Sequence, residues 1–426
     1  MNMQSMAETA KRVSVACAQK SGEEKNRALS AVINALEEQK EVIFQANAAD
    51  LEEAEQQGVA APVLKRLRFD REKLSGVIEG IRGLIQLPDP VGRLLDKTEL
   101  NDGLILHKVS CPIGVIGVVF ESRPDALVQI GTLCLKSGNA VLLKGGTEAK
   151  HTNQALFECI CSAAVAAGMP EGFMQLLHSR EDVSAMLSMD QYIDLIIPRG
   201  SNAFVQYIMR NTNIPVLGHA DGICHVYVDA EADQDMAERI VVDSKTQYVS
   251  VCNAMETLLV HQSIAQSFLP RIKNALEAKG VQLLGCEKTV EILDIPAASE
   301  QDWATEYLDY KLSIKIVASL QEAVAHINRF GSGHTDAIVT ENAKTAEYFM
   351  NMADTANAYW NCSTRFSDGF RYGFGAEVGI STNKIHARGP VGLEGLMIYK
   401  YKLIGHGDIV ADYASGKKHF THKKLI

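Results

Sequence analysis

Residues 111–146 have the sequence CPIGVIGVVFESRPDALVQIGTLCLKSGNAVLLKGG, and this stretch decides the fold class. A β-branched apolar run, GVIGVVF, is followed by a helical stretch and then by a second apolar run, AVLLK. Comparable runs recur up to Val339, namely FMQLLH, DLIIPRG, CHVYVD, TLLVH, LSIKIVA and DAIVT. Strands that alternate with helices predict parallel sheets wrapped by crossover helices. We expect an α/β protein, and two such sheets suit the chain length better than one.

The composition limits the function classes. A chain of 426 residues exceeds one ordinary hydrophobic core, so two or three domains are expected. A formal net charge of -10 argues against nucleic acid as a partner, because its backbone attracts clustered Lys and Arg. The basic run at residues 417–424 is interpreted as a solvated tail. The longest strongly apolar stretch, Ile113 to Phe120, is too short for a membrane span.

The cysteines indicate a reducing compartment. Nine are present, an odd number, and they are scattered through apolar segments, which is typical of reduced thiols in a cytoplasmic protein. No cysteine and histidine spacing matches a zinc site, so we expect no structural metal. The N-terminal segment has no continuous apolar core of the signal-peptide kind, so we expect it to be retained.

Local signals place several elements before the first parallel strand. Residues 7–57 have a helix-forming composition, with Ser21 and Glu24 spaced as a capping box. Gly58 and Pro62 interrupt this pattern, and a further amphipathic helix is predicted from Arg71 to about Leu87. Two strand-like runs flank Asn-Asp-Gly at residues 101–103, which predicts a β-hairpin. A lone hairpin is marginally stable and needs a covering surface, such as a second subunit.

Two strand-to-helix junctions are candidates for binding phosphate. In AVLLKGG, residues 140–146, a buried strand ends in Lys144, Gly145 and Gly146, and a helix begins around Thr147. In IPRGSNAFV, residues 197–205, Gly200 and Ser201 lie at a similar place. Free amides and the helix dipole favour phosphate oxygens at such turns. Ordinary structural loops have the same composition, so both interpretations stay open.

Cys252 is a candidate nucleophile. It lies in QYVSVCNAMETLLVH, after a helix predicted to end near Thr246 and before the strand TLLVH, so a loop or turn is expected. Most buried cysteines act only as small hydrophobic residues, and this alternative also stays open. The glycine-rich segments GSGHTDAIV and GISTNKIHARGPVGLEGL are typical either of ligand-binding loops or of surface loops. The residues alone thus predict a multidomain α/β enzyme without a defined substrate.

Residues 111–146 resemble the start of the cofactor domain in the aldehyde dehydrogenase superfamily. The blocks ESRPD, VCNAMETLLV, EAVAHINRFGSGHTDAIVTE, NCSTRFSDGFRYGFGAEVGISTNKIHARGPVGLEGL and YKYKL resemble the gamma-glutamyl phosphate reductase family within it, over nearly the whole chain. The resemblance implies a Rossmann-type cofactor-binding domain (residues 1–97 and 111–232) and an α/β catalytic domain (233–388). It also implies a small β oligomerisation element (98–110 and 389–426). An acidic stretch at residues 229–235 supports the boundary.

The same resemblance implies an activity. It is the NADPH-dependent reduction of L-glutamate 5-phosphate to L-glutamate 5-semialdehyde, the second step of proline biosynthesis from glutamate. Cys252 matches the nucleophile that forms a thioester. Arg123 takes the place of the asparagine that supplies an oxyanion donor in hydrolytic members. Val216, in VLGHADG, takes the place of the general-base glutamate, which argues against hydrolysis.

Further residue roles follow from the resemblance. The cofactor-binding residues implied or favoured are Lys144, Gly145, Gly146, Thr147, Gly200, Ser201 and Glu306. Thr147 stands where NAD-specific members often have a carboxylate, which favours NADP(H). Phe330 stands where the family usually has His or Tyr, so the local packing is expected to differ. A homo-oligomer and a glutamate 5-kinase partner are expected. The alternatives are another phosphate- or CoA-acylating aldehyde dehydrogenase, and an inert oligomerisation protein of this fold.

Overall fold

The structure, a computed structural model, describes residues 2–218, 221–374 and 377–426. The chain forms two compact units. Unit 1 comprises Met1–Leu217, Phe374–Val378 and Val391–Ile426, and unit 2 comprises Gly218–Gly373 and Gly379–Pro390. The chain first passes between them after Leu217, whereas the sequence prediction ended the cofactor-binding domain at residue 232. The difference arises because strand β7 (Cys224–Val228) pairs with strands of unit 2.

Unit 1 contains a four-stranded parallel sheet. Its strands are β3 (Val115–Phe120), β4 (Ala140–Lys144), β5 (Met174–Leu176) and β6 (Leu195–Arg199), in the order β5-β4-β3-β6. The first apolar runs therefore form strands, as predicted. All residues of β3 and β4 are buried, as expected of parallel strands covered on both faces.

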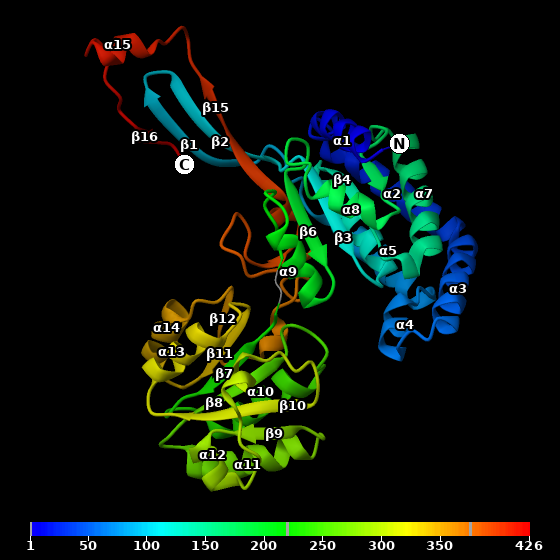
Figure 1. The fold of residues 1–426 in the computed structure, drawn as a ribbon. Coiled ribbons are helices and arrows are strands. Elements are labelled where there is room, and N and C mark those ends of the chain that lie inside the picture. The colour runs from blue at the N-terminus through cyan, green and yellow to red at the C-terminus, as the bar shows by residue number, and fades with distance from the viewer. Residues whose placement is uncertain (1, 219–220, 375–376) are drawn as a thin grey trace. The chain divides into compact units, whose positions relative to one another are not determined.

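The helices of unit 1 pack against this sheet and against one another (Figure 1). They are α1 (Met3–Cys17), α2 (Gly22–Glu38), α3 (Lys40–Gln56), α4 (Ala61–Leu67), α5 (Arg71–Gln86), α6 (Pro124–Ser137), α7 (Lys150–Ala166), α8 (Arg180–Met186) and α9 (Asn202–Arg210). The predicted capping box is confirmed, since Glu24 N–H donates to Ser21 Oγ (3.2 Å) and Ser21 N–H donates to Glu24 Oε2 (2.8 Å). Pro62 lies in the first turn of α4, where a missing N–H is tolerated, so it begins a helix there.

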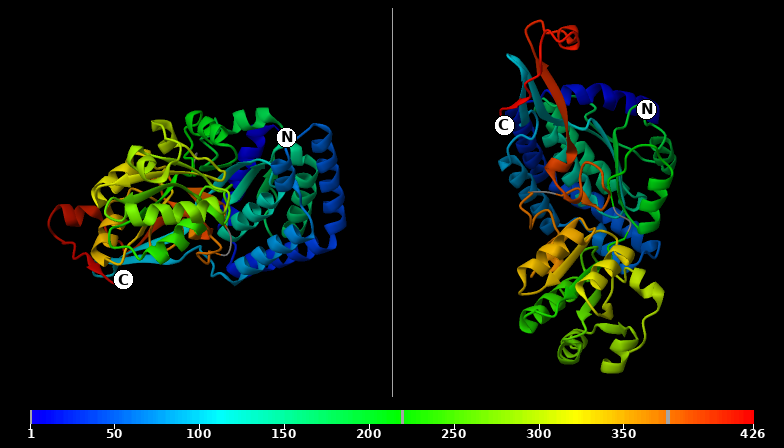
Figure 2. Two further views of the ribbon diagram at one scale, coloured as in Figure 1. Left: turned by 90° about the horizontal axis from the view of Figure 1, so that it is seen from below. Right: turned by 90° about the vertical axis from the view of Figure 1, so that its left-hand side faces the viewer.

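A second sheet of unit 1 is antiparallel. It contains β1 (Leu94–Asn101), β2 (Leu104–Pro112), β15 (Met397–Ile404) and β16 (Lys423–Lys424), in the order β15-β2-β1-β16. The predicted hairpin is confirmed, and Gly103 has the positive φ of +75° that its turn requires. Figure 2 shows the C-terminal strands in red beside the hairpin in cyan, and α15 (Val410–Ala414) follows β15.

Unit 2 contains a six-stranded parallel sheet in the order β12-β11-β7-β8-β10-β9. Besides β7, the strands are β8 (Met255–His261), β9 (Gln282–Gly285), β10 (Lys311–Val317), β11 (Thr335–Val339) and β12 (Asn357–Trp360). The helices of the unit are α10 (Gln234–Thr246), α11 (Ala265–Glu277), α12 (Glu287–Leu293), α13 (Leu320–Phe330) and α14 (Ala343–Met352). The short strands β13 (Gly379–Ser381) and β14 (Gly389–Val391) form a separate pair.

Both faces of this sheet are buried. Val226 and Val228 pack into a cluster with residues of α10 and α11, while Tyr227 between them packs with residues of α13 and α14. This alternation follows from the period of two in a β-strand. The expected pair of parallel sheets is thus confirmed. Within the described part of the chain, none of the helices combines the length and apolar character needed to span a bilayer.

A buried aromatic cluster surrounds His326 in unit 2. The ring of His326 lies 4.7 Å from that of Phe330, 5.5 Å from Trp303 and 5.6 Å from His225. Lys315 Nζ lies 3.2 Å from His326 Nδ1. Burial, with the nearby His225 and Lys315, lowers the pKa of His326 to about 2. Phe330 therefore packs against a histidine that is neutral in the folded state.

We predict that His326 makes unit 2 less stable in acid. The unfolded histidine, with an ordinary pKa of 6.5, binds a proton below that pH, whereas the folded one does not until about pH 2. Stability is therefore lost as the pH falls below 6.5, by about 1.4 kcal/mol per unit. Between pH 7.5 and 5.5, His326→Gln should lose about 1.4 kcal/mol less unfolding free energy than the wild type.

Urea unfolding monitored by tryptophan fluorescence tests this prediction. Both tryptophans, Trp303 and Trp360, lie in unit 2, so the signal reports on that unit. His178→Gln, at an exposed position in unit 1, serves as the control and should behave like the wild type. An equal loss in the His326 variant and the wild type would contradict the prediction.

Candidate active site

The site residues predicted in unit 1 lie at one edge of its parallel sheet. Lys144 ends β4, Gly200 follows β6, and Arg123 follows β3. These three strands are neighbours, with Val119 opposite Lys144 and Phe120 opposite Arg199. The structure thus brings the two glycine turns and Arg123 to the carboxyl ends of adjacent strands, where ligands bind in such sheets.

Two glutamates that sequence reasoning missed contact these turns. Glu148 Oε1 accepts hydrogen bonds from Ser122 N (2.6 Å) and Ser122 Oγ (2.7 Å), and a Cβ at Gly146 would lie 2.0 Å from that oxygen. Glu121 Oε2 accepts from Ser201 N (3.1 Å), and a Cβ at Gly200 would lie 2.6 Å from it. At both positions a side chain would displace the glutamate carboxylate that lies against the backbone. Glu148 lies two residues after Gly146 in the sequence, whereas Glu121 follows β3 and is far in sequence from Gly200.

Lys144 and Arg123 differ in their surroundings. Lys144 is buried, and its Nζ donates to the Gly145 carbonyl oxygen. Arg123 is exposed and precedes α6 without capping it through its side chain. Val216 forms a parallel bridge with Ile196 of β6. In the VLGHADG segment, residues 219–220 lie outside the described residues.

The Cys252 loop lies between α10 and β8, as predicted. The loop is held by its neighbours. The Cys224 thiol donates to the Cys252 carbonyl oxygen (3.2 Å). Asn253 Nδ2 donates to the Ser367 carbonyl (2.7 Å), and the Asn253 carbonyl accepts from Thr364 Oγ1 (2.7 Å). Cys252 is therefore a partly exposed thiol on a loop whose backbone is anchored on both sides.

Other cysteines lie in less suitable surroundings for a nucleophile. A nucleophilic cysteine reacts as the thiolate, which burial disfavours. Burial raises the pKa of Cys17, Cys134, Cys159, Cys161 and Cys224. Cys286, like Cys252, is partly exposed and lies in unit 2. It provides a matched control for experiments on Cys252.

Glu306 is positioned relative to the Cys252 loop by the peptide of Leu308. Leu308 N–H donates to Glu256 Oε1 (3.2 Å), and the Leu308 carbonyl accepts from Ser250 Oγ (3.3 Å). The chain at Leu308 has a φ of 53°, a left-handed conformation that needs such support. Glu306 thus lies two residues from a peptide that is bonded to both sides of the Cys252 loop.

A buried ion pair supports this arrangement. Lys245 Nζ lies 2.5 Å from Glu256 Oε2, and both side chains have 0% exposure. Burial raises the pKa of Glu256 to about 7, and burial also lowers that of Lys245. Each partner therefore stabilises a charge that the protein interior disfavours.

Arg365 is a further residue that sequence reasoning missed. It belongs to the NCSTRFSDG block, whose pattern indicates no particular role for this arginine. Its side chain is almost wholly buried, and its Nε donates to Gln247 Oε1 (3.0 Å). Burial lowers the pKa of Arg365, as does the nearby Arg371, while the nearby Cys252 opposes this shift. A cation therefore lies close to the candidate nucleophile.

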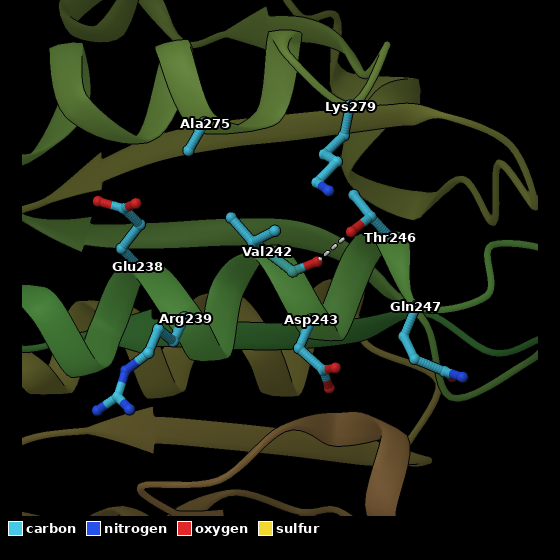
Figure 3. Close-up of a pocket in the computed structure, with 8 residues that line it drawn as sticks. All are labelled: Glu238, Arg239, Val242, Asp243, Thr246, Gln247, Ala275 and Lys279. Carbon is cyan, nitrogen blue, oxygen red and sulfur yellow. Dashed lines mark hydrogen bonds between the residues drawn. The ribbon is translucent and has the colours of Figure 1, made fainter.

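An open pocket lies along α10 in unit 2, and Figure 3 shows its side chains. It is lined by Glu238, Arg239, Val242, Asp243, Thr246, Gln247, Ala275 and Lys279. None of the predicted site residues lines this pocket. In the part of the chain that the structure describes, no group of three or more His, Cys, Asp or Glu side chains is placed to hold a metal ion.

Comparison with known proteins places this arrangement in a family. The model of the aldehyde dehydrogenase family matches residues 1–284. The chain is 60% identical to the gamma-glutamyl phosphate reductase of Pelotomaculum thermopropionicum, over 100% of this chain and 98% of that protein. It is 53% identical to that of Acaryochloris marina, over 99% and 98% of the two chains.

Solved structures agree with this assignment. The crystal structure of the Thermotoga maritima gamma-glutamyl phosphate reductase superposes with a TM-score of 0.94 at 39% identity, covering 96% of this chain and 100% of that one. A second structure is that of an acetylating aldehyde dehydrogenase from Geobacillus thermoglucosidasius, with a TM-score of 0.65 over 96% of this chain and 97% of that one. At 16% identity, this likeness shows the fold alone.

The chain therefore belongs to the aldehyde dehydrogenase family. Within it, the chain belongs with the gamma-glutamyl phosphate reductases, which it matches over its full length, and it is an oxidoreductase. The resemblance and the fold class expected from the sequence are both confirmed.

We predict that Gly222→Ala displaces the Cys252 loop. An added Cβ would lie 2.2 Å from the Cys252 carbonyl oxygen and 2.5 Å from its Cα, so the backbone itself must move. A displacement of about 1 Å at a reacting group costs on the order of 100-fold in rate. We expect a loss of about that size in the kcat/KM of the reductase reaction.

Steady-state kinetics of the purified variant measure this loss. Gly76→Ala, inside α5 with no atom within 4 Å of the new Cβ, is the matched control and should retain full activity. Wild-type activity in a folded Gly222→Ala protein would show that the loop tolerates the displacement.

Proposed function

We propose that the protein reduces L-glutamate 5-phosphate to L-glutamate 5-semialdehyde with NADPH and releases phosphate, the second step of proline biosynthesis from glutamate. The observation that carries this proposal is the full-length match to gamma-glutamyl phosphate reductases, at 60% identity for one relative. The anchored, partly exposed thiol of Cys252 supports it from the structure.

Cys252 is proposed to carry the covalent step. Its thiolate attacks the acyl carbon of the acyl phosphate, the carbon–sulfur bond forms, and phosphate leaves with the electron pair of the broken carbon–oxygen bond. NADPH supplies the hydride that reduces the resulting thioester carbon. The carbon–sulfur bond then breaks, so that the aldehyde is released and the Cys252 thiol is regenerated. The Cys252 N–H and Arg123 are the proposed donors to the carbonyl oxygen.

The carboxyl edge of the sheet in unit 1 fits the proposed cofactor. Gly146 and Gly200 follow the carboxyl ends of β4 and β6, the strands on either side of β3, and the buried Lys144 is the last residue of β4. Thr147 offers no carboxylate to a 2'-phosphate, and the adjacent Glu148 is engaged by two hydrogen bonds from Ser122. Glu306 is the proposed partner of the nicotinamide ribose.

Phosphate rather than water is proposed to exchange with the thioester. Val216 stands where hydrolytic relatives carry a general base, and its side chain cannot accept a proton. A glutamate 5-kinase that supplies the acyl phosphate stays a predicted partner, and cytoplasmic localisation stays a prediction.

We predict phosphate-dependent reduction of NADP by the purified protein with glutamate semialdehyde, supplied in equilibrium with pyrroline-5-carboxylate. Cys252→Ala should abolish the reaction, because no other group can form the thioester. Cys286→Ala should retain it, since that thiol has comparable exposure but no proposed role. Absorbance of the reduced cofactor measures the rate with NADP and with NAD.

Three outcomes would contradict this function. Reduction that needs no phosphate would indicate a hydrolytic aldehyde dehydrogenase. Reduction that needs coenzyme A would indicate an acylating relative. No reduction at all by the wild type would indicate another substrate or an inert protein of this fold.

We also propose that the protein is a homo-oligomer that pairs through the sheet containing β15. This strand lies at an edge of its sheet and carries exposed apolar side chains, among them Tyr401 (59% exposed) and Leu403 (56% exposed). Exposed apolar edge strands commonly pair with another chain.

We predict that Tyr401→Glu combined with Leu403→Glu lowers the molar mass measured by light scattering after size exclusion. Charge on a buried strand interface opposes association. Val42→Glu changes an equally exposed apolar residue on α3 (59%) and should leave the mass unchanged. A wild type that is already monomeric would contradict the proposal.

A further inference from the structure

Arg365 lies on a short turn that contacts the Cys252 loop. The turn is η3 (Thr364–Phe366), which follows β12. Its first residue, Thr364, donates through Oγ1 to the carbonyl of Asn253, the neighbour of Cys252 (2.7 Å). The Arg365 carbonyl accepts from Arg371 Nη1 (2.7 Å), and Arg365 Nε donates to Gln247 Oε1 (3.0 Å). The backbone and one edge of the guanidinium are thereby held in place.

The guanidinium has no carboxylate partner in the described residues. It is 8% exposed, and none of the ion pairs within 4.0 Å includes it. Among these residues its single side-chain hydrogen bond is the one through Nε. An arginine buried to this extent without an ion pair is costly, because charges that are not in contact with it offset its desolvation only in part. The two Nη groups of the guanidinium lie in one plane, and such a pair of donors matches an anion that offers two oxygens.

The charges around Arg365 indicate which kind of anion would bind to it. The cation of Arg371 acts on Arg365 electrostatically, and so do Cys252 and the carboxylates of Asp368 and Asp243. Asp368 Oδ1 accepts from the N–H groups of Phe370 and Arg371, while its Oδ2 lies 3.6 Å from Arg371 Nη1. Two arginines beside two carboxylates form surroundings of mixed charge, which complement an amino acid end that carries an ammonium as well as a carboxylate.

We propose that Arg365 binds the α-carboxylate of the substrate, with Asp368 as the partner of its α-ammonium group. The inference rests on the proposed function, since it assigns the amino acid end of that substrate. In L-glutamate 5-phosphate the carboxylate carbon lies four bonds from the reacting carbon, about 5 Å in an extended chain. Arg365 holds this end of the substrate while Cys252 attacks the other. The residue thereby selects α-amino acid aldehydes and acyl phosphates over simpler ones.

The test compares two aldehydes that differ only in this carboxylate. Phosphate-dependent NADP reduction is measured with glutamate semialdehyde and with 4-aminobutanal, its decarboxylated analogue. Arg365→Gln should lower kcat/KM for glutamate semialdehyde roughly 10- to 100-fold, the size expected for a lost charged hydrogen bond. With 4-aminobutanal, which lacks the carboxylate, the variant should match the wild type. Arg365→Lys keeps the charge but not the planar pair of donors. It should therefore lose activity with glutamate semialdehyde to a smaller extent.

Controls separate this role from the alternatives. Arg329→Gln removes an exposed arginine of unit 2 and should leave both substrates unaffected. An equal loss with both aldehydes and a raised KM for phosphate would assign Arg365 to the phosphoryl group instead. An equal loss together with slower alkylation of Cys252 by iodoacetamide would assign it to the thiolate. Either result overturns the inference.

The proposed function fails in a different way. Absence of phosphate-dependent oxidation by the wild type would reject the reaction itself, whatever the Arg365 variants do. If Arg365→Gln proves unable to fold, as judged by tryptophan fluorescence, the test uses Arg365→Lys instead. The ratio of its kcat/KM for glutamate semialdehyde to its kcat/KM for 4-aminobutanal is then compared with that of the wild type. An unchanged ratio in that variant overturns the inference.

Discussion

The ion pair between Lys245 and Glu256 organises the candidate site of unit 2. Both side chains have 0% exposure, and the charged atoms lie 2.5 Å apart. Removing one partner of such a pair leaves an uncompensated charge and costs about 3–5 kcal/mol. Lys245 lies at the end of α10 and Glu256 near the start of β8, so the pair spans the loop that carries Cys252. Through Leu308, the same carboxylate also positions the segment that contains Glu306.

The two units use their parallel sheets in different ways. In unit 1 the predicted cofactor residues follow the carboxyl ends of β4 and β6. In unit 2 the Cys252 loop and the Glu306 segment precede β8 and β10, which are neighbouring strands. In both cases the parallel arrangement gathers loops from distant parts of the chain at one edge. At Gly222 this gathering leaves no room for a side chain, because an added Cβ would meet the backbone of Cys252.

Polar groups buried in unit 2 divide into satisfied and unsatisfied ones. Glu256 has both a cation and an N–H group as partners. His326 is accommodated by losing its charge. Arg365 forms no ion pair with a carboxylate among the described residues, and it lies beside the loop of the candidate nucleophile. That contrast is the physical basis for assigning it to a ligand.

The sequence by itself determined the features whose signals are local. The hairpin at Asn101-Asp102-Gly103, the capping box at Ser21 and Glu24, the α/β class and the loop position of Cys252 all depend on residues close together in the chain. Tertiary structure alone decided the strand orders, the passage between units after Leu217 and the surroundings of Arg365. Thr364 and Asn253 are 111 residues apart, and no periodicity or spacing encodes such a contact. It exists only because the parallel strands of the sheet bring their loops together.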